Sequence, residues 1–196
     1  KVIVVDDGSK DKTYEQAKKA GAIVLRHKVN KRKGEALRTA FEYAIKKKIK
    51  RFVVVDADLQ YLPEEAKKVL VPIKKMEADL VIGYRNWREV PFRHKLGNFV
   101  WRTLFNMIYG TKFKDTNCGY MAFGERAIFK IKNIHGGYII ENSILNDAVR
   151  ENLRIKQVHV KVLYHKKSSI KRGIRVVLGV LLFILKEGLK YRLSKL

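Results

Sequence analysis

Residues 52–60 read Phe-Val-Val-Val-Asp-Ala-Asp-Leu-Gln, an unbroken apolar run that ends in two carboxylates and an amide. Apolar residues that follow one another without alternation are typical of a strand buried on both faces, as in a parallel sheet covered by helices. The chain opens in the same way, since the apolar residues 2–5 run directly into Asp6-Asp7-Gly8-Ser9. In open α/β sheets, ligands bind at the carboxyl ends of the strands. Both acidic clusters are therefore expected at a ligand-binding edge of such a sheet.

Strands and helices alternate regularly as far as residue 83. Apolar runs predict further strands over 22–25 and 80–82, and apolar stripes at helical spacing predict helices over 13–20, over 34–48 and from Pro63 onward. This order is typical of the α/β class, with a mostly parallel central sheet that carries helices on both faces.

The composition indicates one folded and strongly basic domain. The 196 residues include 43 Lys and Arg against 19 Asp and Glu, for a net charge of +24, and 46% of them are apolar. That apolar content excludes a charged, disordered tail, while the charge suits nucleic acid, an anionic membrane surface or phosphate-bearing substrates. A single cysteine, Cys118, excludes an intrachain disulfide and is typical of a reducing compartment. The longest apolar run, 176–185, is shorter than the roughly 20 residues that span a bilayer, so no transmembrane helix is expected.

Asp56, Asp58 and Gln60 are candidate metal ligands. Two carboxylates separated by one residue can reach one hard divalent cation together, and Gln60 adds a neutral oxygen. Mg²⁺ or Mn²⁺ bound in this way completes its coordination with water and substrate phosphates. The structural alternative is that Asp58 caps the helix that begins near Pro63, or that both acids are solvated in a turn.

Asp6 and Asp7 are candidate nucleoside ligands, because a carboxylate at a strand end can accept hydrogen bonds from a nucleobase N–H or a ribose hydroxyl. Gly8 lets the backbone turn closely against such a ligand. The structural alternative is a plain turn in which Asp11 or Thr13 caps the next helix.

Five motifs in this order resemble the family 2 glycosyltransferases of GT-A fold, and within them the dolichyl-phosphate mannose and glucose synthases. The motifs are Val4-Val5-Asp6-Asp7-Gly8-Ser9, Asn30-x-x-Lys33-Gly34-x-Ala36-Leu37, Asp56-Ala57-Asp58-Leu59-Gln60, Gly83-x-Arg85 and Asp115-Thr116-x-Cys118-Gly119-Tyr120. The resemblance covers nearly the whole chain and implies a Rossmann-like fold. The last motif is closer to the glucose synthases, whose usual donor is a UDP-sugar.

The resemblance also implies a set of site residues. The donor nucleotide would be bound by Asp6, Asp7, Lys33 and Asp56, and a Mg²⁺ or Mn²⁺ ion beside its diphosphate by Asp56, Asp58 and Gln60. The acceptor phosphate would be bound by Arg85 and Arg93, and the catalytic residues would be Asp58, Arg85 and Asp115. For Asp115, stabilisation of its own turn is the alternative. Glu141 matches one customary acid of the family, and Ser143 stands where a second acid is usual.

The reaction implied is metal-dependent, inverting transfer of a hexose or N-acetylhexosamine from a nucleotide sugar to dolichyl or polyprenyl phosphate. A UDP-sugar is the favoured donor and GDP-mannose the other option. Two alternatives remain open, namely the same fold with a soluble sugar or glycan as acceptor, and a basic nucleic-acid-binding module. The sequence shows no helix-turn-helix, zinc-finger or RNA-binding aromatic motif, so nucleic acid is not expected as a partner.

The resemblance suggests how the chain is divided. Residues 1–165 are expected to form the catalytic domain, including a basic amphipathic helix over 92–109, and residues 166–196 a basic amphipathic C-terminal helix. A further strand of the family is expected upstream of Lys1. The helix over 92–109, with Phe99, Trp101 and Phe105, resembles interfacial helices that seat these enzymes on an anionic membrane, which implies a peripheral or monotopic place on its cytoplasmic face. The alternative is an ordinary helix that faces the core. Beyond it, a strand is predicted over 157–162 and a helix over 170–189.

Overall fold

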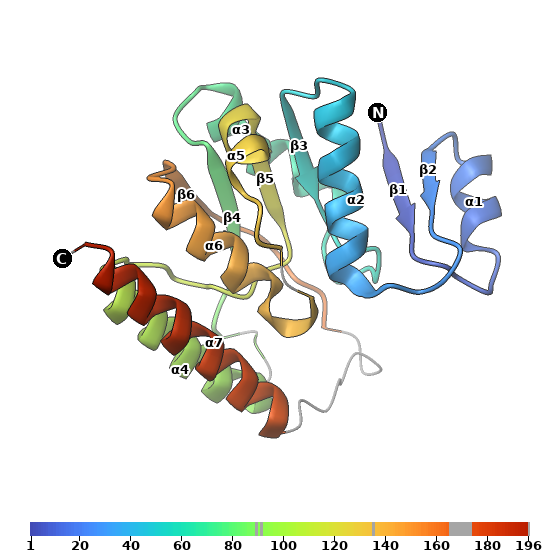
Figure 1. The fold of residues 1–196 in the computed structure, drawn as a ribbon. Helices are drawn as coiled ribbons and strands as arrows, with labels where there is room; N and C mark the ends of the chain where they lie inside the picture. Colours follow the sequence, from blue (N-terminus) through green and yellow to red (C-terminus); the bar gives the residue numbers. More distant parts are fainter. Residues whose placement is uncertain (89, 91, 135, 165–173, 196) are drawn as a thin grey trace.

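The computed structural model describes residues 1–88, 90, 92–134, 136–164 and 174–195, and Figure 1 shows how its elements are arranged. In chain order they are β1 (Ile3–Asp6), α1 (Thr13–Lys19), β2 (Ile23–Arg26), α2 (Arg32–Lys46), β3 (Arg51–Val54), η1 (Pro63–Glu65), α3 (Ala66–Lys74), β4 (Leu80–Tyr84), α4 (Phe92–Tyr109), β5 (Met121–Gly124), α5 (Glu125–Lys130), η2 (Gly137–Ile139), α6 (Ile140–Arg150), β6 (Ile155–His159) and α7 (Ile174–Leu193). The helices and strands predicted before residue 110 are confirmed to within a few residues, whereas the sequence patterns did not identify β5 and α5.

The central sheet is mixed, so the expectation of a mostly parallel sheet is wrong. Its strand order is β3-β5-β4-β6, in which β5 is antiparallel to both neighbours and only β4 and β6 are parallel. β1 and β2 form a separate parallel pair at one end of the molecule (Figure 1). All four residues of β5 are buried. A buried apolar strand has the same pattern in either direction, so its periodicity does not reveal which way it runs.

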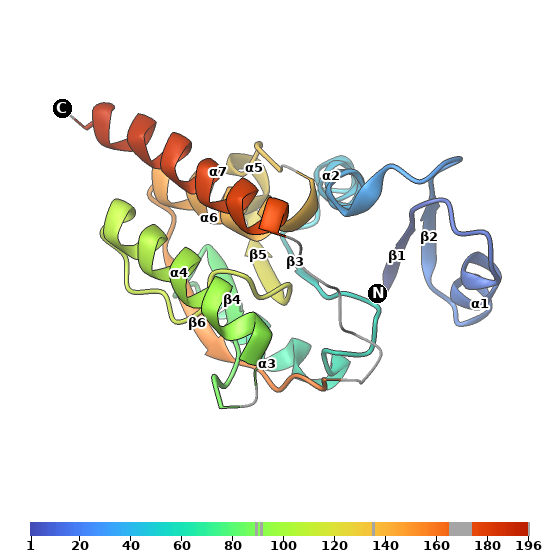
Figure 2. The ribbon, with the colours of Figure 1, turned by 90° about the horizontal axis from the view of Figure 1, so that it is seen from below.

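Helices cover both faces of the central sheet, as predicted. Figure 2 shows α3 on one side of the strands and α2, α5, α6 and α7 on the other. Neighbouring residues of β4 belong to two different cores, because Leu80 and Ile82 pack with residues of α2, α4 and α6, whereas Val81 packs with residues of α3. This alternation explains why β4 is apolar at consecutive positions.

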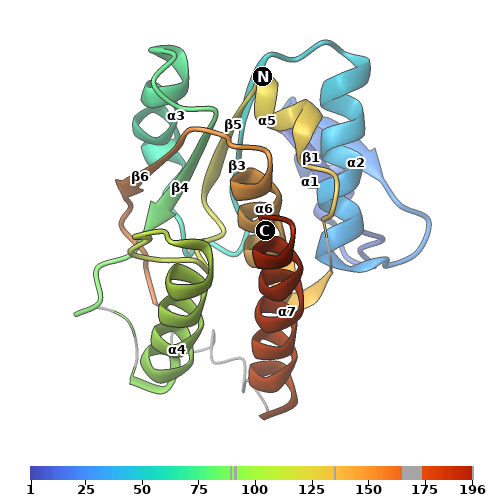
Figure 3. The ribbon, with the colours of Figure 1, turned by 60° about the vertical axis from the view of Figure 1, so that its left-hand side comes forward.

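α4 and α7 lie side by side (Figure 3), and side-chain to backbone hydrogen bonds join them. Trp101 Nε1 donates to the carbonyl oxygen of Val177 at 3.3 Å, and Arg192 donates to that of Met107 at 3.0 Å. Trp101 and Phe105 are fully buried in the core, as the alternative of a core-facing helix expects, while Phe99 remains half exposed. Within the described part of the chain, every helix is too short or too polar to cross a membrane.

Candidate active site

Asp6, at the end of β1, is buried and contacts neighbouring residues through both carboxylate oxygens. Its side chain is fully buried, its Oδ1 accepts a hydrogen bond from the Ser9 N–H at 3.0 Å, and its Oδ2 forms an ion pair with Arg26 Nε at 3.1 Å. Arg26 is the last residue of β2 and lies opposite Asp6 in the parallel register. The first acid of the pair therefore holds the two strand ends together.

Asp7 is held by the loop that follows β2. Its Oδ1 contacts His27 Nδ1 at 2.6 Å and accepts the Lys31 N–H at 2.9 Å. Burial opposes ionisation, but the hydrogen bonds from Lys31 and His27 outweigh it and hold the pKa of Asp7 below its usual value. Gly8 lets the turn after β1 pack against the loop that follows β2. A Cβ at this position would lie 2.7 Å from Asn30 N, and the backbone has a positive φ of 73°.

Asp56, two residues after the end of β3, contacts Lys33 of α2 and lies beside Gly119. Its Oδ2 is 2.8 Å from Lys33 Nζ, which also lies 3.3 Å from Glu141 Oε1 in α6. A Cβ on Gly119 would lie 2.7 Å from the same Asp56 oxygen, so any larger residue there would displace the Asp56 carboxylate. The Lys33 and Asp56 side chains are 42% and 32% exposed, which leaves them accessible to a ligand.

The electrostatics of this cluster fit a divalent cation. Burial raises the pKa of Asp56 against the opposing effect of Lys33, and the nearby Glu141 and Asp58 carboxylates raise it further. For Lys33, burial acts to lower the pKa, but Glu141 and Asp56 raise it above its usual value, so the amine stays charged. One ammonium offsets one of three carboxylates, and the remaining negative charge would be neutralised by Mg²⁺ or Mn²⁺.

Asp58 lies on a tight, strained turn. Its Oδ1 accepts the Gln60 N–H at 3.0 Å, and Leu59 between them has a positive φ of 61°. The η1 turn begins at Pro63, its N-cap residue is Leu62, and no side chain caps it, so the alternative in which Asp58 caps it is wrong. No group of three or more His, Cys, Asp or Glu side chains among the described residues could hold a metal ion by itself. Phosphate oxygens and water would therefore complete the coordination of a cation at this turn.

Arg85 and Asp115 form a buried ion pair after β4. Arg85 donates from Nε to Asp115 Oδ2 at 2.7 Å and from its terminal NH2 group to Oδ1 at 3.0 Å. The two side chains are only 10% and 3% exposed. Burial alone would lower the pKa of Arg85, but Asp115 raises it, so the guanidinium is permanently charged. Asp115 therefore fixes the position of a cation at the end of β4.

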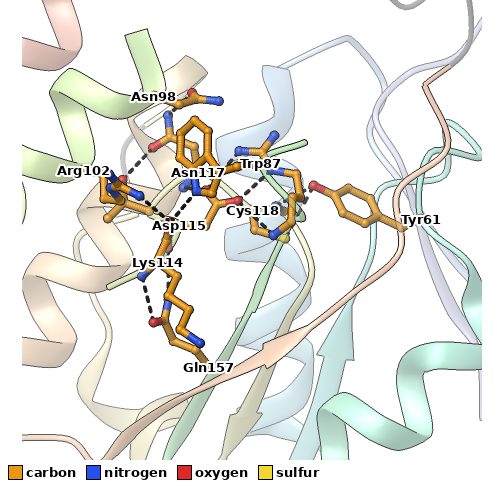
Figure 4. Close-up of polar contacts among 12 residues, drawn as sticks. Tyr61, Trp87, Asn98, Arg102, Lys114, Asp115, Asn117, Cys118 and Gln157 are labelled. Atoms are coloured by element: carbon orange, nitrogen blue, oxygen red, sulfur yellow. Dashed lines mark hydrogen bonds and ion pairs between the residues drawn. The ribbon is translucent and has the colours of Figure 1, made fainter. Parts of the chain in front are cut away.

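The loop from Asp115 to Gly119 is held in place by polar side chains (Figure 4). The Asn117 N–H donates to Asp115 Oδ1 at 3.0 Å, and the Asn117 side chain contacts Asn142 of α6 at 2.9 Å. The hydroxyl of Tyr61 accepts the Gly119 N–H at 3.2 Å. Burial raises the pKa of the neighbouring Cys118 thiol to about 12, so it remains protonated and serves in packing.

Comparison with known proteins identifies the family. A family model described as glycosyl transferase family 2 matches residues 1–134. The chain belongs to glycosyltransferase family 2. It is 34% identical over 185 residues to an uncharacterized protein of Methanocaldococcus jannaschii, MJ1222, covering 91% of this chain and 76% of that protein. It is 28% identical over 206 residues to a UDP-N-acetylglucosamine–dolichyl-phosphate N-acetylglucosaminyltransferase of Methanococcus voltae, covering 93% and 82% of the two chains.

The fold of this family 2 glycosyltransferase is also that of a solved structure. Glucosyl-3-phosphoglycerate synthase from Mycobacterium tuberculosis, in complex with phosphoglyceric acid, superposes with a TM-score of 0.74 over 94% of this chain and 68% of that one, at 22% identity. The same enzyme was solved with Mn²⁺, UDP-glucose and phosphoglyceric acid, with a TM-score of 0.70 at 20% identity over 95% and 68% of the two chains. The GT-A fold expected from the motifs is thereby confirmed.

Two groups of the predicted site residues of this glycosyltransferase are brought together, one around Lys33 and Asp56 and one around Arg85 and Asp115. Glu141, which matches a customary acid of the family, contacts Lys33, 108 residues away in the chain. Tyr61 and His27 carried no signal in the sequence, since neither belongs to a motif. Arg93 lies in the first turn of α4, but its side chain, like the whole segment 165–173, is outside the described residues.

Proposed function

We propose that this glycosyltransferase catalyses metal-dependent, inverting transfer of a hexose or N-acetylhexosamine from a nucleotide sugar to dolichyl or polyprenyl phosphate. The observation that carries the proposal is the meeting of Lys33, Asp56 and Glu141 beside Gly119, because it joins separate motifs in one accessible site of net negative charge. The Methanococcus voltae relative, named for transfer from UDP-N-acetylglucosamine to dolichyl phosphate, supports both the UDP-linked donor and the lipid acceptor.

On the donor side, Asp7 is the better nucleoside ligand of the acidic pair, since both oxygens of Asp6 are engaged by Ser9 and Arg26. Asp56, Asp58 and Gln60 would hold Mg²⁺ or Mn²⁺, which when bound supplies Lewis-acid stabilisation of the departing nucleoside diphosphate. Lys33 adds a positive charge at the same place. These residues together would orient the diphosphate and stabilise the charge that develops on it.

On the acceptor side, Arg85 would bind the phosphate with the N–H groups that Asp115 leaves available, and Arg93 would add a second cation. A phosphate monoester is already anionic near neutral pH, so it can attack the anomeric carbon without a strong general base. Its attack from the side opposite the leaving diphosphate inverts the anomeric configuration. Asp115 acts in this scheme as a positioning residue, because its contact is with Arg85.

A soluble acceptor is the second candidate. The structural neighbour of known fold was solved with phosphoglyceric acid, a small soluble molecule that also carries a phosphate. Arg85 could bind the phosphate of either acceptor. The two candidates therefore use the same site residues, and they differ only in whether the acceptor must carry a lipid.

Transfer assays distinguish these candidates. The protein is incubated with UDP- or GDP-sugars, Mn²⁺, and either a polyprenyl phosphate in detergent or a soluble phosphorylated acceptor, and products are measured by mass spectrometry. We expect product with the lipid phosphate, loss of it in Asp58→Ala, and no loss in the control Glu64→Ala, which removes an exposed carboxylate nearby. Full activity of Asp58→Ala contradicts the metal assignment, and product only with the soluble acceptor contradicts the lipid assignment.

We also propose that the α4–α7 pair rests on an anionic membrane surface. Large apolar side chains are exposed on both helices, namely Leu96, Phe99, Val100 and Met107 of α4 and Leu178, Leu182, Leu185, Leu189 and Leu193 of α7. The leucines of α7 recur at helical spacing along one face, and Lys95, Arg102, Lys186 and Lys190 supply positive charge on the same helices.

Vesicle flotation tests this surface. We expect the protein to float with vesicles that contain anionic lipid and less with zwitterionic ones, and the double variant Leu182→Ser/Leu189→Ser to stay behind. Met76→Ser, which removes an exposed apolar side chain after α3, is the matched control. Equal flotation of all three proteins would contradict the proposal.

A further inference from the structure

His27 links the carboxylate of Asp7 to helix α2. Its Nδ1 lies 2.6 Å from Asp7 Oδ1, and its Nε2 lies 2.9 Å from the hydroxyl oxygen of Thr39. The imidazole is only 10% exposed, and the Asp7 carboxylate is 17% exposed. The three side chains therefore form one partly buried row from the end of β1 to the middle of α2.

The chemistry of the row assigns a role to each atom. An ionised carboxylate only accepts hydrogen bonds, so Nδ1 of His27 carries the proton that is donated to Asp7. Nε2 faces a hydroxyl that can donate or accept, which suits this nitrogen in either protonation state of the ring. Thr39 thereby fixes the plane of the imidazole, and the imidazole fixes the carboxylate.

The backbone explains why a side chain of this shape is needed. Asp6 pairs with Arg26 in the parallel register of β1 and β2, so the next residues, Asp7 and His27, leave the strands side by side. The His27 N–H donates to the Asp6 carbonyl oxygen at 2.9 Å, which continues the ladder to that point. Lys31 and His27 both bind Oδ1 of Asp7, and the backbone N–H of Arg32 adds a further hydrogen bond to the carboxylate, so the loop after β2 and the His27 side chain hold it together.

We infer that His27 is a positioning residue of the donor site, which holds Asp7 in the orientation that binds the nucleoside and is itself held by Thr39. The inference rests on the proposed function, because it takes Asp7 as the nucleoside ligand. It predicts that His27 acts on donor affinity, and that it has no part in the chemical step at the anomeric carbon.

Two substitutions separate positioning from mere packing. His27→Asn keeps an N–H close to the place of Nδ1 and loses the contact with Thr39, whereas His27→Gln places its amide near Nε2 and loses the contact with Asp7. Titration calorimetry of the full chain with UDP and with GDP, in the presence of Mn²⁺, gives the dissociation constants. We expect His27→Gln to weaken binding of the preferred nucleotide roughly tenfold, as the loss of one hydrogen bond to a charged group does, and His27→Asn to weaken it less than about threefold.

A double-mutant cycle supplies the second readout. In an Asp7→Ala background, His27→Gln should cause no further loss of affinity, because the side chain that it positions is gone. Urea unfolding of each variant shows whether affinity merely follows stability. Equal weakening by His27→Asn and His27→Gln, or additive losses in the cycle, would overturn the positioning role. If the wild-type protein binds neither UDP nor GDP, the proposed function fails, and the role of His27 fails with it.

Discussion

Replacing Asp115 with Asn removes the charge from a buried ion pair and keeps the shape of the side chain. In the native protein Asp115 accepts two hydrogen bonds from the Arg85 guanidinium, at 2.7 and 3.0 Å, and a third from the Asn117 N–H at 3.0 Å. The Asp115 side chain is only 3% exposed, so in the variant water cannot reach the Arg85 guanidinium to solvate its unpaired charge. Removing one partner of a buried pair costs 3–5 kcal/mol, and because Asn still offers one accepting oxygen we expect about 3 kcal/mol.

The exposed pair Lys156–Glu77 is the matched control. Its atoms are 2.7 Å apart, as close as those of Arg85 and Asp115, but the two side chains are 48% and 43% exposed. Exposed pairs contribute little because water solvates both partners, so Glu77→Gln should leave the unfolding midpoint almost unchanged. The comparison therefore separates the effect of burial on stability from the effect of the distance between the charges.

Urea and thermal unfolding of the three proteins give the result. For a domain of this size, about 3 kcal/mol corresponds to a fall in Tm of roughly 6–12 °C in Asp115→Asn. A loss of stability in Asp115→Asn no larger than that in Glu77→Gln would refute the reasoning, since burial would then add nothing to the pair.

Three further predictions concern the proposed metal site, the pH dependence of folding and the core. Gly119→Ala should weaken Mn²⁺-dependent nucleotide binding, measured by calorimetry, because its Cβ would lie 2.7 Å from Asp56 Oδ2; unchanged binding would contradict this. Hydrogen bonds from Arg154 lower the pKa of Asp79, so Asp79 stabilises the fold above its unfolded pKa of about 3.9 and this contribution is lost as the pH falls through the lower folded value. Asp79→Asn should therefore destabilise the protein at pH 7 and converge with wild type in acid unfolding curves, and a constant difference would speak against it. Phe123→Ala should lower the unfolding free energy by about 3–5 kcal/mol in urea, since the ring is fully buried against two other aromatic rings; a loss below about 1 kcal/mol would mean that the site collapses around the cavity.

Local patterns predicted most of the helices and strands, because burial on one face or on both imposes a period on neighbouring residues. They also located the carboxylates, since Asp6 ends strand β1, Asp7 follows it, and Asp56 lies two residues after β3. The same patterns did not decide whether the aromatic residues of α4 face the core, as Trp101 does, or the surface, as Phe99 does. An amphipathic stripe reports that one face of a helix is covered, and it does not say whether protein or another surface covers it.

The sequence by itself determined the α/β class, the family and the order in which the acidic and basic motifs occur. Only the tertiary structure decided which of them meet, as with Lys33 and Glu141, 108 residues apart, and Arg85 and Asp115, 30 residues apart. It also decided the antiparallel direction of β5 and the row from Asp7 through His27 to Thr39. The physical reason is that periodicity records the environment of each residue, whereas a contact between distant residues depends on the path of the chain between them.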